Sequence, residues 1–274
     1  PKPKQWGPHH AAMFQDQSVV SAYGFRPPYP AQTSSILLSL LPATGERFVL
    51  DAGCGPGAIA RALVGQVDGV DAVDISPGMI ALGRTLPGGD HRRLRWIEGP
   101  IESAPLRPQY GLIVAAASLH WMDWPLALPR FADHLLAGGF LAIVEETHEP
   151  NPWDDEIRPV LARYSLNQDF APYTIRTVAE ELALRGLFEQ CGVQETALAP
   201  FCQPVANWVA SFHARNGFSR ERMGQPAAAA FDDELTRIIL RHCPDRFVSL
   251  PTGARVLWGK PLPQRAPGVA QSSQ

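Results

Sequence analysis

The chain lacks the features that are typical of membrane proteins and of nucleic-acid-binding proteins. No apolar run in its 274 residues approaches the ~20 residues that a helix needs to span a bilayer. The formal net charge is −3, so no excess of positive charge would attract a phosphate backbone or an anionic lipid surface. We therefore expect neither a nucleic acid nor a membrane as a partner.

Cysteine is scarce, and its four copies do not have the spacing of a metal site. Cys54, Cys191, Cys202 and Cys243 are scattered along the chain. Because disulfides persist mainly in oxidising compartments, we expect these thiols to be reduced. The sequence therefore predicts a cytoplasmic protein with no bound metal.

Apolar residues, in contrast, are plentiful, at 45% of the chain, which is enough for a substantial core. Between residues 48 and 147, short apolar runs with strand character alternate with helical segments. This alternation is typical of a parallel sheet that is covered by helices on both faces. The length is consistent with one enlarged α/β domain.

The most informative segment is residues 48–58, where an apolar strand ends at Asp51 and then breaks into glycines. Gly53 and Gly55 permit a tight turn and a close approach of a ligand to the backbone. The glycines also satisfy a dinucleotide-binding pattern, so they do not identify the ligand. Asp51 favours a cationic ligand, because at roughly 6 Å and an effective dielectric of about 20 each carboxylate–phosphate pair would cost about 3 kcal/mol.

The order of motifs along the chain resembles that of the class I S-adenosylmethionine-dependent methyltransferases. The glycine loop at 51–57 is followed by a strand that ends in an acid at Asp74, and then by strands at 94–99 and 112–117. A Leu-His-Trp element occupies 119–121, and a Gly-Gly turn precedes a fifth strand. Residues 23–30 resemble the N-terminal segment of the type 11, trans-aconitate methyltransferase-like group. The resemblance spans about residues 14 to 260.

The resemblance implies S-adenosylmethionine as the cofactor and S-adenosylhomocysteine as its product. Asp74 would accept hydrogen bonds from both ribose hydroxyls, and Ile75 and Met79 would flank the adenine. Pro100 stands where the family usually has an acid, so the Ile101 N–H would meet the adenine instead. The cofactor-binding residues that we expect are Tyr23, Arg26, Asp51, Gly53, Gly55, Asp74, Ile75, Met79, Pro100, Ile101, Ala116 and Ala117.

His120 is the candidate catalytic residue. It follows the fourth strand, at the edge where the methyl group would be presented, and the ordinary pKa of a histidine lies near neutrality, as a general base requires. Aromatic residues in two segments outside the strands are expected to enclose the acceptor. The substrate-binding candidates are Phe14, Tyr29, Trp121 and Trp153.

We therefore expect an α/β fold with a Rossmann-like, seven-stranded, mostly parallel sheet and helices on both faces. A capping box at 177–180 predicts a helix that reaches about Cys191, followed by a strand over 193–201. The expected parts of the chain are an N-terminal lid at 1–47, the cofactor-binding core at 48–149, a helical insertion after strand five at 150–192 that contributes to the acceptor pocket, C-terminal strands and helices at 193–260, and a disordered tail at 261–274.

The predicted function is transfer of a methyl group to an oxygen or a carbon of a small-molecule acceptor. Two alternatives use the same fold: a cyclase-like enzyme that holds the cofactor without transferring its methyl group, and a non-catalytic cofactor-binding subunit of a partner. A nicotinamide-dependent oxidoreductase is disfavoured by Asp51. The sequence carries no clear signal of an oligomeric state.

Overall fold

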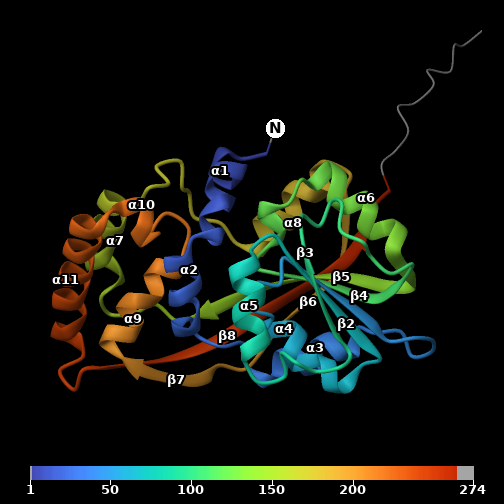
Figure 1. Ribbon diagram of the computed structural model, residues 1–274, viewed down its shortest axis with the longest axis horizontal. Coiled ribbons are helices and arrows are strands. Elements are labelled where there is room, and N and C mark those ends of the chain that lie inside the picture. Colours follow the sequence, from blue (N-terminus) through green and yellow to red (C-terminus); the bar gives the residue numbers. More distant parts are fainter. Residues whose placement is uncertain (1, 264–274) are drawn as a thin grey trace, which may run out of the picture.

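The computed structural model describes residues 2–263 and places eight strands in a single sheet (Figure 1). Of the expected tail, residues 264–274 lie outside the described part. The strand order is β3-β2-β1-β4-β5-β8-β6, and β7 pairs with β8 away from this path. The strands are β1 (Phe48–Ala52), β2 (Gly69–Asp74), β3 (Leu94–Glu98), β4 (Tyr110–Ala116), β5 (Leu135–His148), β6 (Phe188–Glu195), β7 (Ala199–Pro204) and β8 (Phe247–Pro261).

The predicted fold class is confirmed, with one strand more than expected. Strands β1 to β5 are parallel, whereas β8 runs antiparallel to its neighbours. The additional strand arises because β8 is long enough for two partners. Residues 247–252 of β8 pair with β7, and residues 255–261 pair with β6.

Helices cover the sheet on both sides, and a second group of helices gathers at one end of the molecule (Figure 1). We call α7, α9, α10 and α11 the C-terminal helical unit. The α-helices are α1 (Pro8–Ala11), α2 (Gln17–Ala22), α3 (Ala31–Ser39), α4 (Ala58–Leu63), α5 (Pro77–Thr85), α6 (Trp124–His134), α7 (Asp154–Tyr164), α8 (Ile175–Leu184), α9 (Val205–Ser211), α10 (Arg220–Met223) and α11 (Gln225–His242). Short 3-10 helices include η1 (Lys4–Trp6), η2 (Ala12–Gln15), η3 (Tyr23–Phe25), η4 (Val64–Gln66), η5 (Leu119–Trp121) and η6 (Phe212–Ala214).

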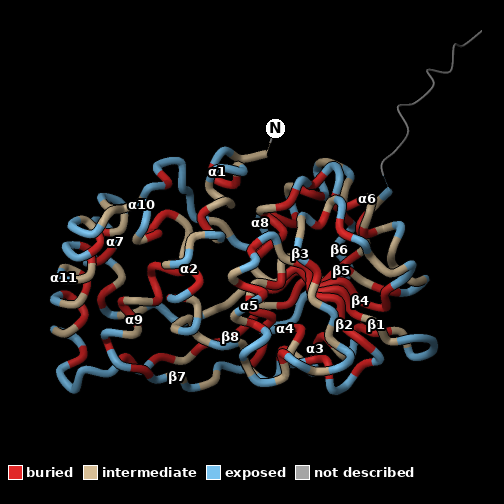
Figure 2. Tube along the Cα trace, in the orientation of Figure 1, coloured by how far each residue is buried: buried red, intermediate tan, exposed pale blue. Residues whose placement is uncertain are grey.

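Four hydrophobic clusters form the core of the described residues, and Figure 2 shows the buried residues concentrated along the sheet. Successive side chains of a strand point to opposite faces, so Val49 and Leu50 of β1 belong to different clusters although both are fully buried. The third cluster lies within the C-terminal helical unit and includes Trp153, Trp208 and Phe231. No helix among residues 2–263 is long and apolar enough to cross a membrane.

The predicted boundaries after residue 174 were wrong. The helix begins at Ile175, because the hydroxyl of Thr174 accepts from the Thr177 N–H and that of Thr177 accepts from the Thr174 N–H. It ends at Leu184, before Gly186 with its φ of +67°. The expected strand over 193–201 is two strands, β6 and β7, because each pairs with a different half of β8.

The buried carboxylate of Asp71 in β2 forms hydrogen bonds with side chains of β3 and β4. Asp71 is fully buried, and its Oδ1 accepts from Nε of Arg95 at 3.0 Å and from Nε of Arg107 at 3.2 Å. Its Oδ2 accepts from Nη2 of Arg95 and from the Tyr110 hydroxyl, both at 2.6 Å. Removing the negative charge would leave two guanidinium groups without their partner.

We expect Asp71→Asn to lower the free energy of unfolding by about 2–4 kcal/mol, as measured by urea denaturation. Asp155→Asn is the matched control, because Asp155 is 89% exposed and pairs only with its helix neighbour Arg158. That pair should contribute less than about 0.5 kcal/mol. A loss below about 1 kcal/mol for Asp71→Asn would show that this network does not stabilise the sheet.

Candidate functional site

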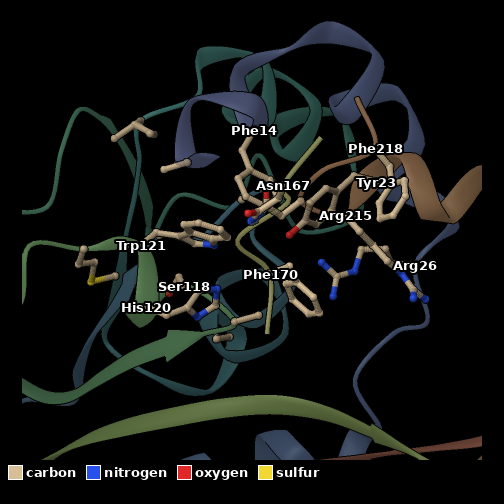
Figure 3. Close-up of a pocket in the computed structure, with 18 of the residues that line it drawn as sticks. Phe14, Tyr23, Arg26, Ser118, His120, Trp121, Asn167, Phe170, Arg215 and Phe218 are labelled. Atoms are coloured by element: carbon tan, nitrogen blue, oxygen red, sulfur yellow. The ribbon is translucent and has the colours of Figure 1, made fainter. Parts of the chain in front are cut away.

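A cavity of about 800 Å³ opens at the carboxyl ends of β1, β2 and β4. It begins at the glycine loop after β1 and extends between residues 2–30, which we call the N-terminal segment, and the C-terminal helical unit (Figure 3). Ligands of open α/β sheets bind outside the carboxyl ends of the strands, so this cavity occupies the expected position. Within residues 2–263, no group of three or more His, Cys, Asp or Glu side chains could hold a metal ion.

The loop after β1 depends on the absence of side chains at its glycines. Gly53 has a φ of +67°, and a methyl group there would lie 2.6 Å from Cβ of Ser118. The Ser118 hydroxyl donates to the Ala52 carbonyl at 2.6 Å, and the Gly55 N–H donates to Asp74 Oδ2 at 2.7 Å. These bonds fix the loop against β4 and β2 while leaving its backbone exposed to the cavity.

Asp74, at the end of β2, lines the cavity beside the glycine loop. Its Oδ2 accepts from Gly55, and its Oδ1 accepts from the Ser76 N–H at 2.8 Å. Burial raises the pKa of this carboxyl group above its usual value. A carboxylate oxygen can accept more than one hydrogen bond, so Asp74 retains acceptor capacity for the hydroxyls of a ligand.

Asp51, at the end of β1, lies beneath the glycine loop and does not line the cavity. Only 1% of this residue is exposed. Its Oδ2 accepts from the Ala60 N–H at 3.0 Å, whereas its Oδ1 has no hydrogen-bond partner among residues 2–263. Burial, together with the charge of Asp74, raises the pKa of Asp51 to about 7. A positive charge above the loop would favour the ionised form of this carboxyl group.

His120 lies among aromatic rings. Its ring centroid is 4.7 Å from that of Trp121, 4.9 Å from that of Tyr173 and 5.8 Å from that of Trp6. Its Nε2 is 2.9 Å from the Tyr173 hydroxyl oxygen, within hydrogen-bond distance. Its neighbour Trp121 also packs against Phe14 of the N-terminal segment, at 5.4 Å between ring centroids.

The surroundings of His120 differ from what its position in the sequence led us to expect. Burial lowers its pKa to about 3, and the positive charges of Lys2 and Arg26 act in the same direction. The imidazole is therefore neutral at physiological pH, but it is a much weaker base than a histidine of ordinary pKa. The expectation of a titration near neutrality was wrong, because it ignored the aromatic residues around the ring.

The N-terminal segment contributes polar and aromatic groups to the cavity. The Arg26 guanidinium donates to Glu146 Oε1 at 3.1 Å and lies 5.4 Å from the ring centroid of Tyr23. This ion pair connects the segment to the end of β5. Figure 3 shows Tyr23 and Arg26 on the same side of the cavity.

The structure brings most of the residues expected from the sequence to one cavity. Those that line it are Phe14, Tyr23, Arg26, Gly53, Gly55, Asp74, Ile75, Met79, Ile101, Ala116, Ala117, His120 and Trp121. Asp51, Tyr29, Pro100 and Trp153 do not line it. Tyr29 packs against the cluster beneath α3 and α4, and Trp153 is 3% exposed within the C-terminal helical unit, so its ring is held by packing.

Several cavity residues had no signal in the sequence. Ser118, Asn167, Arg215, Asn216 and Phe218 line the cavity from segments far apart in the chain. Apart from Ser118, which precedes the Leu-His-Trp element, they belong to irregular segments without periodicity. Only the packing of the C-terminal helical unit against the N-terminal segment places them together.

Comparison with known proteins agrees with the fold. A family model described as a methyltransferase domain matches residues 49–139. A malonyl-[acyl-carrier protein] O-methyltransferase of Enterobacter lignolyticus is 33% identical over 202 residues, which cover 69% of this chain and 76% of that protein. A trans-aconitate 2-methyltransferase of Delftia acidovorans is 30% identical over 179 residues, or 59% of this chain and 63% of the relative.

A solved structure from Anaeromyxobacter dehalogenans, described as that of a type II methyltransferase, has the same fold. Its TM-score is 0.60 at 21% sequence identity, and the match covers 87% of this chain and 99% of that one. The chain belongs to the class I S-adenosylmethionine-dependent methyltransferases. The family resemblance predicted from the motifs is thus confirmed.

The lowered pKa of His120 predicts that acid destabilises the protein through this residue. An unfolded histidine takes up a proton near pH 6.5, whereas the folded one does so only near pH 3, so the unfolded state binds more protons between these values. The free energy of unfolding of the wild type should exceed that of His120→Gln by less as the pH falls from 7 to 4.5. We expect this difference to decrease by up to about 1.4 kcal/mol per pH unit.

Chemical denaturation at each pH measures this difference. His148→Gln, which alters an exposed histidine, is the control and should follow the wild type at every pH. If the difference in free energy of unfolding between the wild type and His120→Gln does not change with pH, then His120 has the same pKa in the folded and unfolded states.

Proposed function

We propose that the protein transfers a methyl group from S-adenosylmethionine to an oxygen or carbon atom of a small-molecule acceptor. The observation that carries the proposal is one continuous cavity with Asp74 and the glycine loop at one end and an aromatic compartment at the other. Membership of the family supports the reaction type. The dimensions and aromatic lining of the cavity support a small acceptor.

The residues at the sheet edge fit this cofactor. Asp74 would accept from the ribose hydroxyls, and Ile75, Met79 and Ile101 offer apolar surface for the adenine. The unpaired Oδ1 of Asp51 lies beneath the loop over which a cationic ligand would sit. When bound, S-adenosylmethionine supplies a methyl group activated by a sulfonium, and S-adenosylhomocysteine remains as the product.

The other end of the cavity would bind and orient the acceptor. Phe14 and Trp121 form one part of its wall, and Phe170, Phe212 and Phe218 form another. Holding a nucleophile in line with an activated methyl group accounts for much of the rate of such a reaction. These rings would also exclude water from the reacting atoms.

The neutral, weakly basic His120 favours an acceptor that needs no strong base. With its Nε2 close to the Tyr173 hydroxyl, the imidazole would position the acceptor and shape the cavity wall. An acceptor that is already ionised at neutral pH could react without losing a proton to the protein.

We also propose a cytoplasmic location. All four cysteines are free, and two of them, Cys191 and Cys202, are exposed. Exposed free thiols are typical of reducing compartments.

We expect Asp74→Ala to weaken the binding of S-adenosylhomocysteine by about 1.5–3 kcal/mol, because the variant loses charge-assisted hydrogen bonds to the ribose. Isothermal titration calorimetry measures the dissociation constant. Asp90→Ala, at an exposed position outside the cavity, should bind like the wild type. NAD should not bind to any of the three proteins.

An unchanged dissociation constant in a folded Asp74→Ala variant would remove Asp74 from the cofactor site. Binding of NAD by the wild type without binding of S-adenosylhomocysteine would contradict the proposed function itself.

A further inference from the structure

Arg215 presents a guanidinium to the cavity, and Glu146 and Asp154 act on its charge from farther away than an ion pair. It follows η6 in the C-terminal helical unit, and its side chain lines the cavity together with Phe170 and Arg26 (Figure 3). Within residues 2–263, its guanidinium makes no ion pair and no hydrogen bond. Arg215 is half-buried, and arginines that are removed from water are usually paired with an acidic group.

The nearby acidic groups are already engaged. Glu146 pairs with Arg26 at 3.1 Å, and Asp154 accepts from the Asn151 N–H at 2.8 Å. Burial and the positive charge of Arg26 lower the pKa of Arg215 to about 10, although Glu146 and Asp154 act in the opposite direction, so the guanidinium remains charged at neutral pH. A charge that is partly removed from water and makes no ion pair loses hydration, and an anionic ligand would compensate for that loss.

The segment that carries Arg215 is firmly held. The guanidinium carbon lies 4.2 Å from the ring centroid of Phe212. His213, which is fully buried, lies 2.6 Å from the Phe218 carbonyl through Nδ1 and 2.8 Å from Asp232 Oδ1 through Nε2. These contacts fix the turn on both sides of Arg215, so its charge is presented to the cavity from a rigid support.

Two amide oxygens in the same cavity also lack partners. Oδ1 of Asn167 and Oδ1 of Asn216 are buried and accept no hydrogen bond from residues 2–263. The Asn167 amide donates to the Gln5 carbonyl at 3.3 Å, which orients its oxygen. A ligand that carries a hydroxyl or N–H group would satisfy them.

We propose that the guanidinium of Arg215 binds a carboxylate of the acceptor, so that the acceptors of this enzyme are organic acids. The inference rests on the proposed function, since it assumes that the acceptor occupies this cavity. A guanidinium presents two parallel N–H donors that match a carboxylate. The methionine carboxylate of the cofactor has the same chemistry, so the test must distinguish the two sources.

The test measures binding to the S-adenosylhomocysteine complex by calorimetry. The probes are octanoate, 4-hydroxybenzoate and trans-aconitate, each compared with a neutral counterpart: octanamide, 4-hydroxybenzamide and trimethyl trans-aconitate. We expect at least one acid to bind the wild type more tightly than its neutral counterpart. Arg215→Met should weaken the binding of that acid by roughly 10- to 100-fold and change the affinity for S-adenosylhomocysteine by less than about twofold.

Two further variants test whether the effect depends on this position and on the donor geometry of an arginine. Arg237→Gln is the matched control, because Arg237 belongs to the same helical unit but is exposed and does not line the cavity. It should leave acid binding within about twofold of the wild type. Arg215→Lys keeps the charge but loses the paired N–H donors, so it should weaken the binding of the acid by roughly 3- to 10-fold.

The melting temperature of the ligand-free protein separates binding from a structural role. Arg215→Met removes an unpaired charge and should melt at the same temperature as the wild type or higher. If Arg215 mainly stabilises Phe212 through its cation–π contact, the variant will melt lower or fail to fold, and the inference is wrong.

Two other outcomes would also overturn the inference. One is that no acid binds the wild type better than its neutral counterpart. The other is that Arg215→Met loses affinity for S-adenosylhomocysteine, which would assign the guanidinium to the cofactor. In either case, binding of S-adenosylhomocysteine by the wild type leaves the proposed function standing, and only its absence would contradict that function.

Discussion

Two carboxylates at the ends of neighbouring parallel strands determine the charge of the ligand that the site favours. Asp51 is buried and Asp74 is half-buried, and burial together with the negative charge of Asp74 raises the pKa of Asp51 to about 7. Backbone N–H groups of Ala60, Gly55 and Ser76 compensate in part, and they also fix the glycine loop and the start of α5. The remaining negative potential is directed at the loop, where a ligand with positive charge and hydroxyl donors would be favoured and a pyrophosphate disfavoured.

The proposed acceptor end of the cavity is built differently, by the N-terminal segment and the C-terminal helical unit. Asp16, before α2, accepts from Arg222 Nε and from the Ser219 hydroxyl, both at 2.6 Å, and the Ser18 N–H donates to Glu221 at 2.7 Å. These bonds connect the N-terminal segment to the C-terminal helical unit beside the cavity. The proposed cofactor end therefore lies on the sheet, whereas the proposed acceptor end depends on polar contacts between two peripheral segments. Such a division allows the acceptor specificity to vary without changes in the sheet.

The sequence was sufficient for the parallel half of the fold and insufficient for the rest. Strands β1 to β5 could be predicted because short apolar runs, glycine turns and strand-end acids are local patterns. The boundaries of α8, β6 and β7 could not, because they depend on pairing with β8, which lies far along the chain. The environment of His120 was missed because Trp6 and Tyr173 create it, and Arg215 was missed because no local pattern marks a residue after a short 3-10 helix.

A crystal structure of the protein with S-adenosylhomocysteine would test the central claim most directly. The account predicts that the ligand occupies the cavity at the carboxyl ends of β1 and β2. Both ribose hydroxyls should donate to Asp74, the adenine should lie against Ile75, Met79 and Ile101, and the homocysteine should lie over Gly53 and Gly55. A ligand bound elsewhere, or one in this cavity whose ribose does not reach Asp74, would contradict it.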